Sequence, residues 1–114
     1  MAESRSDLLL GTLDLLVLKL LAVESTHGWG LAEQLEKTSD GVFCVNQGSL
    51  YPALQRLKRR GLVTSSWQVT ANGRRARYYA LTAKGRRQLV SELASWARTS
   101  GGVNRILAFE GGGE

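Results

Sequence analysis

Apolar residues recur every three or four positions in four segments of the chain, the spacing expected of helices packed on a core. The first three segments cover residues 12–24, residues 31–37, and a stretch that starts at Asn46 or Ser49 and ends at Arg60. The fourth starts after Thr82. Before it, residues 62–70 and 75–81 are predicted as strands joined by a turn at Ala71-Asn72-Gly73, in which Asn72-Gly73 is a hairpin signal. The pattern predicts a mainly α protein with a small β-hairpin.

The ends of these segments carry suitable capping residues. Asn46 or Ser49 can accept hydrogen bonds from the first N–H groups of the third helix, Pro52 fits its first turns, and Gly61 suits its C-terminal cap. Thr82 is predicted to cap the last helix. Gly101-Gly102 weakens that helix by about 1 kcal/mol per glycine, which predicts a kink or fraying there.

Two helices carry more apolar surface than one small core needs. Leu16 and Leu20 lie on one side of the first helix and Leu15 and Leu18 on another, so it is apolar nearly all round. We expect a partner chain to cover the second side, the alternative being the last helix of the same chain. The last helix has a heptad-like seam suited to dimerisation, formed by Leu89, Leu93, Trp96, Val103 and Leu107.

The net charge of +5 and pI of about 9.9 conceal an uneven distribution. Residues 41–91 contain ten basic side chains and no acidic one, whereas residues 1–40 are acidic overall. A one-signed stretch of this kind favours a polyanionic partner. Lys84, Arg86 and Arg87 are predicted in the first turns of the last helix, where cations oppose the helix dipole. An outside group such as a phosphate is expected to compensate them.

Three helices followed by a basic hairpin is the element order of a winged helix-turn-helix. The predicted domains are a DNA-binding domain over residues 1–81, one C-terminal dimerisation helix over 82–108, and a disordered tail over 109–114. The N-terminal turn of the third helix presents Gln47, Ser49 and Tyr51, which suit base edges in the major groove. Arg74 and Arg75 at the hairpin tip suit the minor groove. Tyr51 has the alternative of a half-buried packing role.

Several other classes of protein do not fit. With one histidine and one cysteine, neither a familiar zinc set nor an internal disulfide is available, and no nucleophile–base pair or phosphate loop suggests an enzyme. The apolar run at residues 8–23 is too short to span a membrane and contains Asp14 and Lys19. We therefore expect a cytoplasmic protein without cofactor or metal. His27 is predicted to be a helix-end or packing residue and Cys44 a small buried one.

Three motifs resemble the PadR family, named for phenolic-acid decarboxylase regulators. They are the run from His27 to Leu35, the run from Gly48 to Leu54 with Leu57 and Gly61-Leu62-Val63, and the run from Arg75 to Thr82 with Gly85. The resemblance extends from about Leu8 to Leu107, and the single short C-terminal helix is similar to that of the smaller subgroup. Trp29 departs from the tyrosine common at its position.

The resemblance implies a homodimeric transcriptional regulator, usually a repressor, that binds a pseudo-palindromic operator in double-stranded DNA and is often released by a small molecule. By position it implies base or nearby phosphate contacts from Gln47, Ser49 and Tyr51, and a minor-groove contact from Arg74 or Arg75. Arg77, Arg56 and Lys58 are implied phosphate or surface groups. In some members an aromatic residue of the last helix contacts flat ligands. Trp96 is the candidate for a small aromatic effector here, the alternative being packing against the partner's first helix.

Two other functions stay open. A winged helix can serve as a protein-interaction module, which predicts an apolar or mixed third-helix surface. A non-specific nucleic-acid binder would keep the salt dependence of binding but lose operator discrimination, which in specific readers is about 4–10 kcal/mol. The polar cluster of Gln47, Ser49 and Tyr51 favours a specific reader.

Overall fold

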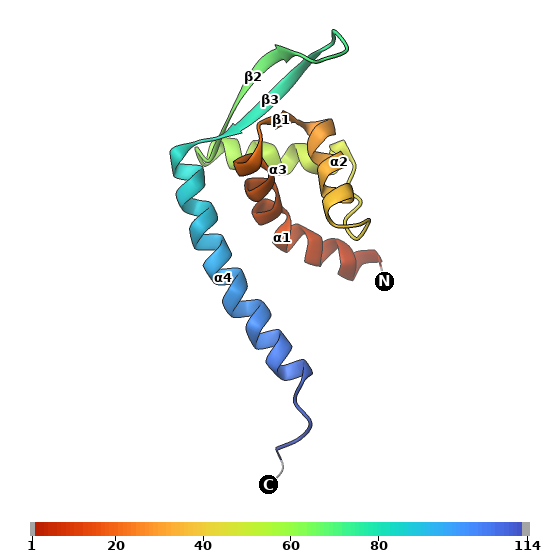
Figure 1. The fold of residues 1–114 in the computed structure, drawn as a ribbon, viewed down its shortest axis with the longest axis vertical. Coiled ribbons are helices and arrows are strands. Elements are labelled where there is room, and N and C mark those ends of the chain that lie inside the picture. Colours follow the sequence, from red (N-terminus) through yellow and green to blue (C-terminus); the bar gives the residue numbers. More distant parts are fainter. Residues whose placement is uncertain (1, 113–114) are drawn as a thin grey trace.

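The computed structural model describes residues 2–112, with side chains described from Thr12 onward. These residues form four helices, α1 (Ala2–Val23), α2 (Gly28–Thr38), α3 (Gln47–Arg59) and α4 (Ala83–Leu107). Three strands, β1 (Thr26–His27), β2 (Val63–Val69) and β3 (Arg75–Leu81), form the sheet. Figure 1 shows the β2–β3 hairpin projecting at one end and α4 running away from the helical body at the other. The predicted four helices and hairpin are confirmed.

The third strand was not expected from the sequence. β1 pairs with β3 in an antiparallel sheet of order β1-β3-β2, with Thr26 opposite Tyr79 and His27 opposite Tyr78. The sequence predicts only a helix break from His27 to Gly30, with the next helix beginning at Leu31, whereas α2 begins at Gly28. A two-residue strand has no periodicity, so only its pairing with β3 defines it.

The core lies between the three N-terminal helices and the base of the hairpin. The side chains with almost no exposure come from α1, α2, α3 and the chain just after α3: Leu13, Val17, Leu18, Leu31, Leu50, Leu54, Leu57, Leu62 and Val63. α4 packs against α1 of the same chain, and Leu89 is buried in this core. Leu16 and Leu20 are only partly buried. Leu15 and Leu18, on the second apolar side of α1, are both buried, so the same chain covers this side, as the alternative to a partner chain states.

The end of α3 and the start of α4 are joined by capping hydrogen bonds. Gly61, at φ +77°, and Leu62 donate backbone N–H groups to the carbonyls of Lys58 and Leu57, which closes α3 with a Schellman motif. Thr82 caps α4 by accepting from the Gly85 N–H, and its hydroxyl donates to the Gly61 carbonyl. The junction therefore fixes α4 relative to α3.

The same junction corrects one expectation about charge. Lys84 is compensated within the chain, because its Nζ donates to the Arg60 carbonyl at the C-cap of α3, 2.9 Å away. The negative end of the α3 dipole thus stabilises a cation that lies at the positive end of α4. Lys84 does not need a phosphate for this.

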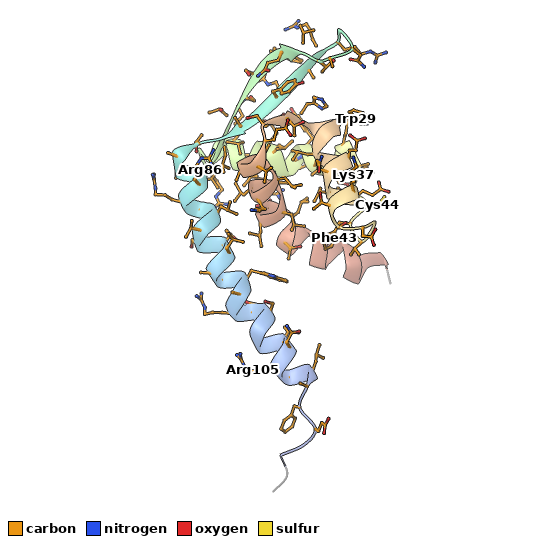
Figure 2. All side chains as sticks on the ribbon, viewed as in Figure 1. Trp29, Lys37, Phe43, Cys44, Arg86 and Arg105 are labelled. Atoms are coloured by element: carbon orange, nitrogen blue, oxygen red, sulfur yellow. The ribbon has the colours of Figure 1, made fainter. Side chains whose placement is uncertain are left out.

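α4 is continuous through Gly101-Gly102 to Leu107, and no break occurs at the glycine pair. Residues 109–112 have neither helix nor strand, and the rest of the expected tail, residues 113–114, lies outside the described residues. In Figure 2 the outer half of α4, with Arg105 near its end, extends beyond the helical body. Much of α4 is thus free of contact with its own chain.

Candidate nucleic-acid interface

The first turn of α3 is solvent-exposed, and Asn46 caps its N-terminus. Asn46 has extended backbone angles (φ −82°, ψ 167°), and its side-chain oxygen accepts from the Ser49 N–H at 2.9 Å. Of the two caps that the sequence allows, Asn46 is the one observed. Because Leu50 and Leu54 are buried below, Gln47, Ser49 and Tyr51 are all exposed, and Tyr51 retains 59% of its accessible surface.

The tip of the hairpin is ordered by its own backbone. Thr70 N–H donates to the Arg74 carbonyl at 2.7 Å, and Gly73 N–H donates to the Thr70 carbonyl at 2.9 Å. Gly73 has φ +84°, a conformation that glycine adopts without strain. This turn leaves Arg74 at the tip and Arg75 as the first residue of β3, both exposed.

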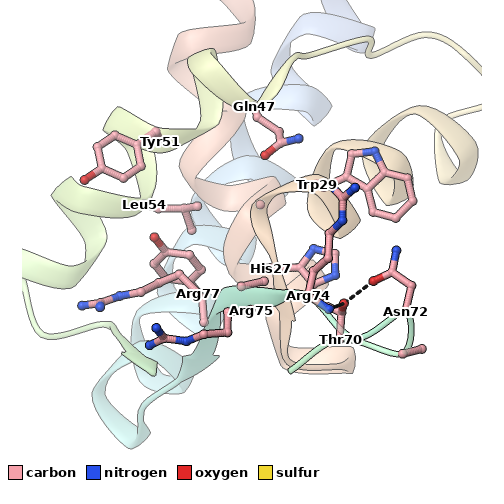
Figure 3. Close-up of a pocket in the computed structure, with 14 residues that line it drawn as sticks. His27, Trp29, Gln47, Tyr51, Leu54, Thr70, Asn72, Arg74, Arg75 and Arg77 are labelled. Atoms are coloured by element: carbon pink, nitrogen blue, oxygen red, sulfur yellow. Dashed lines mark hydrogen bonds between the residues drawn. The ribbon is translucent and has the colours of Figure 1, made fainter. Parts of the chain in front are cut away.

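These elements enclose a hollow of about 810 Å³ between the N-terminal ends of α2 and α3 and the hairpin, shown in Figure 3. α3 contributes Gln47, Tyr51 and Leu54, while the hairpin contributes Thr70, Asn72, Arg74, Arg75, Arg77 and Tyr79. His27 and Trp29 line the side next to α2. None of the lining residues is acidic. The hollow therefore combines three cations with hydrogen-bonding and aromatic groups.

The structure brings some of the candidate DNA-binding residues together and keeps others apart. Gln47, Tyr51, Arg74, Arg75 and Arg77 line the hollow, and Ser49 is exposed in the same turn as Gln47. Lys58 is half-buried and is not among the lining residues.

Arg56 also lies outside the hollow. Its guanidinium pairs with Asp14 of α1, with 3.0 Å between Nη2 and Oδ1, and both side chains are partly buried. The ion pair links α3 to α1. Sequence reasoning had no signal for it, because the two residues are separated by 42 positions.

His27 fulfils the prediction of a helix-end residue. Its Nδ1 accepts from the Gly30 N–H at 3.0 Å, so in the neutral ring the proton is on Nε2. The ring contacts Tyr78 edge-on, with centroids 5.1 Å apart, and stacks on Trp29 at 5.9 Å. Trp29 is 59% exposed, and sequence reasoning did not identify it as a site residue. An unusual aromatic residue just after a helix-breaking glycine was the available signal.

Tyr79 lies at the floor of the hollow and connects the hairpin to α3. Burial raises the pKa of its phenol above the usual 10.0, and the neighbouring Tyr51, negative when ionised, raises it further. The Arg77 charge and a hydrogen bond with Gln55 act in the opposite direction and are weaker. Tyr79 therefore stays neutral throughout the physiological range.

This shift gives a pH prediction. A group that holds its proton more tightly when folded stabilises the protein below its unfolded pKa and loses that contribution as pH rises through the folded value. We expect the stability of the wild type to fall more steeply above about pH 10 than that of Tyr79→Phe. Urea unfolding at a series of pH values from about 8 to about 11 measures this, with Tyr78→Phe as the control. Parallel curves for wild type and Tyr79→Phe would contradict the assignment.

The outer part of α4 carries the candidate dimer residues. Leu93, Trp96, Val103 and Leu107 are between 44% and 77% exposed, whereas Leu89 already belongs to the core of its own chain.

The single cysteine, Cys44, is exposed, so the expectation that it is buried is wrong. It lies in the connection between α2 and α3.

Two features of the described residues bear on the excluded classes. No helix within residues 2–112 is long and apolar enough to cross a membrane. Among the side chains described, from Thr12 onward, no three histidine, cysteine or acidic groups cluster as a metal site would require.

The three N-terminal helices, the three-stranded sheet and the basic hairpin define a winged helix-turn-helix protein. The family model of the transcriptional regulator PadR-like family matches residues 17–91. The chain therefore belongs to the PadR-like family of transcriptional regulators.

Solved structures agree with this assignment. A PadR-like transcriptional regulator from Bacillus cereus is 31% identical, with a TM-score of 0.80, and the match covers 91% of this chain and 99% of that one. A PadR family regulator from Eggerthella lenta is 30% identical with a TM-score of 0.78, covering 96% and 93%. Bacillus subtilis PadR, solved in complex with operator DNA, is 21% identical with a TM-score of 0.63, covering 71% of this chain and 46% of that one.

Proposed function

We propose that this regulator is a homodimeric repressor that binds a pseudo-palindromic operator in double-stranded DNA. The exposed turn of α3 reads bases in the major groove through Gln47, Ser49 and Tyr51, and the hairpin inserts Arg74 or Arg75 into the minor groove. The observation that carries the proposal is that Gln47, Tyr51 and three arginines of the hairpin line one hollow without a carboxylate. Bacillus subtilis PadR, which shares this fold, was solved in complex with operator DNA, and this supports an operator as the partner proposed here.

The homodimer is supported by the apolar surface that α4 leaves uncovered. Leu93, Trp96, Val103 and Leu107 follow one another at helical spacing and keep at least 44% of their surface. Burial of such surface is favourable by roughly 25 cal/mol per Å², so a second copy of α4 or α1 is the proposed partner. A dimer also suits an operator whose half-sites are related by two-fold symmetry.

Release by a small aromatic effector belongs to the same proposal, with Trp96 as its contact. Trp96 is 45% exposed in the single chain, and an exposed aromatic ring can stack on a flat ligand. The alternative is that Trp96 only packs on α1 of the partner. In that case, aromatic compounds change neither Trp fluorescence nor operator affinity.

Arg56 and Lys58 are proposed only as weak phosphate contacts, since neither lines the hollow.

Fluorescence anisotropy at physiological salt tests the proposal. The full chain is titrated onto the DNA upstream of its own gene and onto a scrambled duplex of equal length. Tight binding to the first duplex alone, with two chains per duplex, is the expected result. Equal binding to both duplexes would favour the non-specific binder. Binding to neither would favour the protein-interaction module, which the basic and polar surface of α3 disfavours.

Tyr51→Ala separates base reading from general affinity. We expect about a tenfold or greater loss on the upstream duplex, because one base contact contributes roughly 1–3 kcal/mol of discrimination, and much less loss on the scrambled one. Tyr51→Phe is the matched control, since it keeps the exposed ring and removes only the hydroxyl. Equal losses of Tyr51→Ala on the two duplexes would remove Tyr51 from the base-reading residues.

A further inference from the structure

Trp67 of β2 lies against two arginines of β3. It pairs with Arg77 across the hairpin, and Val69 pairs with Arg75, so these four side chains share one face of the sheet. The guanidinium carbon of Arg75 lies 4.8 Å from the centre of the Trp67 ring, and that of Arg77 lies 5.3 Å from it. Both distances are within the range of a cation–π interaction. One indole therefore holds two guanidinium groups.

A further contact restricts Arg77. Its Nε donates to the Ser65 hydroxyl at 3.1 Å, which leaves the two terminal nitrogens of the guanidinium to point outward. With the ring on one side and the hydroxyl at its base, the Arg77 side chain is held at two points. Ser65 comes from the same strand as Trp67, so β2 supports the arginines of β3.

This arrangement brings like charges together without a compensating anion. Arg75 and Arg77 contact the same ring, and the one ion pair among the described side chains joins Arg56 to Asp14 elsewhere. Neighbouring cations repel each other, which costs stability in the free protein. An anion that binds both Arg75 and Arg77 would relieve this repulsion, because it neutralises the two charges. The two arginines line the hollow, whereas Trp67 is not among the lining residues.

We propose that Trp67 is a positioning residue for DNA binding, which orders Arg75 and Arg77 before contact so that they meet adjacent backbone phosphates and leaves Arg74 at the hairpin tip for the minor groove. The inference rests on the proposed function. An arginine free in solution loses much rotamer entropy when it binds a phosphate. An arginine already held against a ring loses less, so the duplex binds more tightly without any additional contact.

Three variants test this on the full-length protein. Trp67→Leu removes the π face, Trp67→Phe keeps a smaller one, and Val69→Ala changes an exposed neighbour on the same face of the hairpin. Because Trp67 is 56% exposed, each variant should stay folded, with a melting temperature within about 3 °C of the wild type. Binding is measured by anisotropy on the upstream duplex and on the scrambled duplex over a range of salt concentrations.

We expect Trp67→Leu to lose about tenfold in affinity on both duplexes, Trp67→Phe to recover part of the loss, and Val69→Ala to stay within about twofold. The slope of log K against log salt should not change, because the same phosphates are still contacted. In the DNA-free protein, ¹⁵N relaxation of the arginine Nε–H groups should show Arg75 and Arg77 ordered in the wild type and mobile in Trp67→Leu.

The outcomes separate the inference from the function it rests on. If the wild type binds neither duplex, the proposed DNA binding fails, and the positioning role fails with it. If the wild type binds while Trp67→Leu binds equally well, only the positioning role fails. It is equally overturned if the salt slope of Trp67→Leu falls, or if the two arginines are mobile in the wild type, since either result shows that Trp67 does not act by ordering them.

Discussion

Gly85→Ala is expected to destabilise this regulator severely while leaving its surface unchanged. Gly85 lies in the first turn of α4, and a Cβ at this position would overlap the Leu62 carbonyl oxygen and crowd the Leu81 side chain. The obstacle is backbone, so rotation of a side chain does not relieve it. Overpacking of this kind costs typically about 1–3 kcal/mol, and a rigid contact belongs at the upper end.

A loss of about 3 kcal/mol corresponds to a fall in melting temperature of roughly 10–20 °C for a domain of this size. Thermal unfolding followed by circular dichroism measures it. Gly101→Ala is the matched control, because its Cβ would meet only the movable end of the Arg105 side chain at 3.4 Å. In the control, alanine gains up to about 1 kcal/mol in helix propensity. A Gly85→Ala protein as stable as the wild type would show that α4 can shift away from the end of α3.

The close packing of Gly85 against the Leu62 backbone is part of the junction that positions the hairpin beside α3. Thr82 N–H donates to the Leu62 carbonyl, and the Thr82 hydroxyl donates to the Gly61 carbonyl. The base of the hairpin, the end of α3 and the start of α4 thus meet within a few residues. Since β3 leads directly into α4, these hydrogen bonds fix the position of the hairpin, with its arginines, relative to α4 and α3.

The helices and the hairpin could be predicted because their signals are local. The Asn46 cap, Gly61 and the Asn72-Gly73 turn act on residues within four positions of themselves. The apolar spacing predicts that α1 begins near Thr12, whereas the helix begins at Ala2. β1 was missed because two residues carry no pattern, and its pairing with β3 joins segments about fifty positions apart.

Local signals in the sequence predict part of the candidate site, and the rest depends on tertiary contacts. Charge counting and the turn at Asn72-Gly73 were enough to find Arg74 and Arg75 at the tip. They were not enough to separate Arg56, which pairs with Asp14, from arginines that face the hollow. The role of Trp67 depends on cross-strand register, which pairs it with Arg77. Register follows from the turn, and a three-residue turn Ala71-Asn72-Gly73, centred on Asn72, places Trp67 opposite Arg77.

The second large effect is expected for the double variant Arg74→Ala with Arg75→Ala. Each arginine that neutralises a phosphate contributes about 0.9 to the slope of log K against log salt. In the proposed homodimer, two arginines from each chain would therefore account for a slope of about 3–4. We expect the double variant to lose that slope together with roughly a hundredfold or more in affinity at low salt, on the upstream and the scrambled duplex alike.

Arg98→Ala with Arg105→Ala is the matched control. It removes the same net charge, but both residues are exposed on α4, with Arg105 near the end of the helix far from the hairpin (Figure 2). A general effect of charge would lower the affinity of both double variants equally, and that result would contradict the role assigned to the hairpin. If only the hairpin variant loses slope, the arginines at its tip contact phosphate directly. An unchanged slope in the hairpin variant would show that neither Arg74 nor Arg75 contacts phosphate.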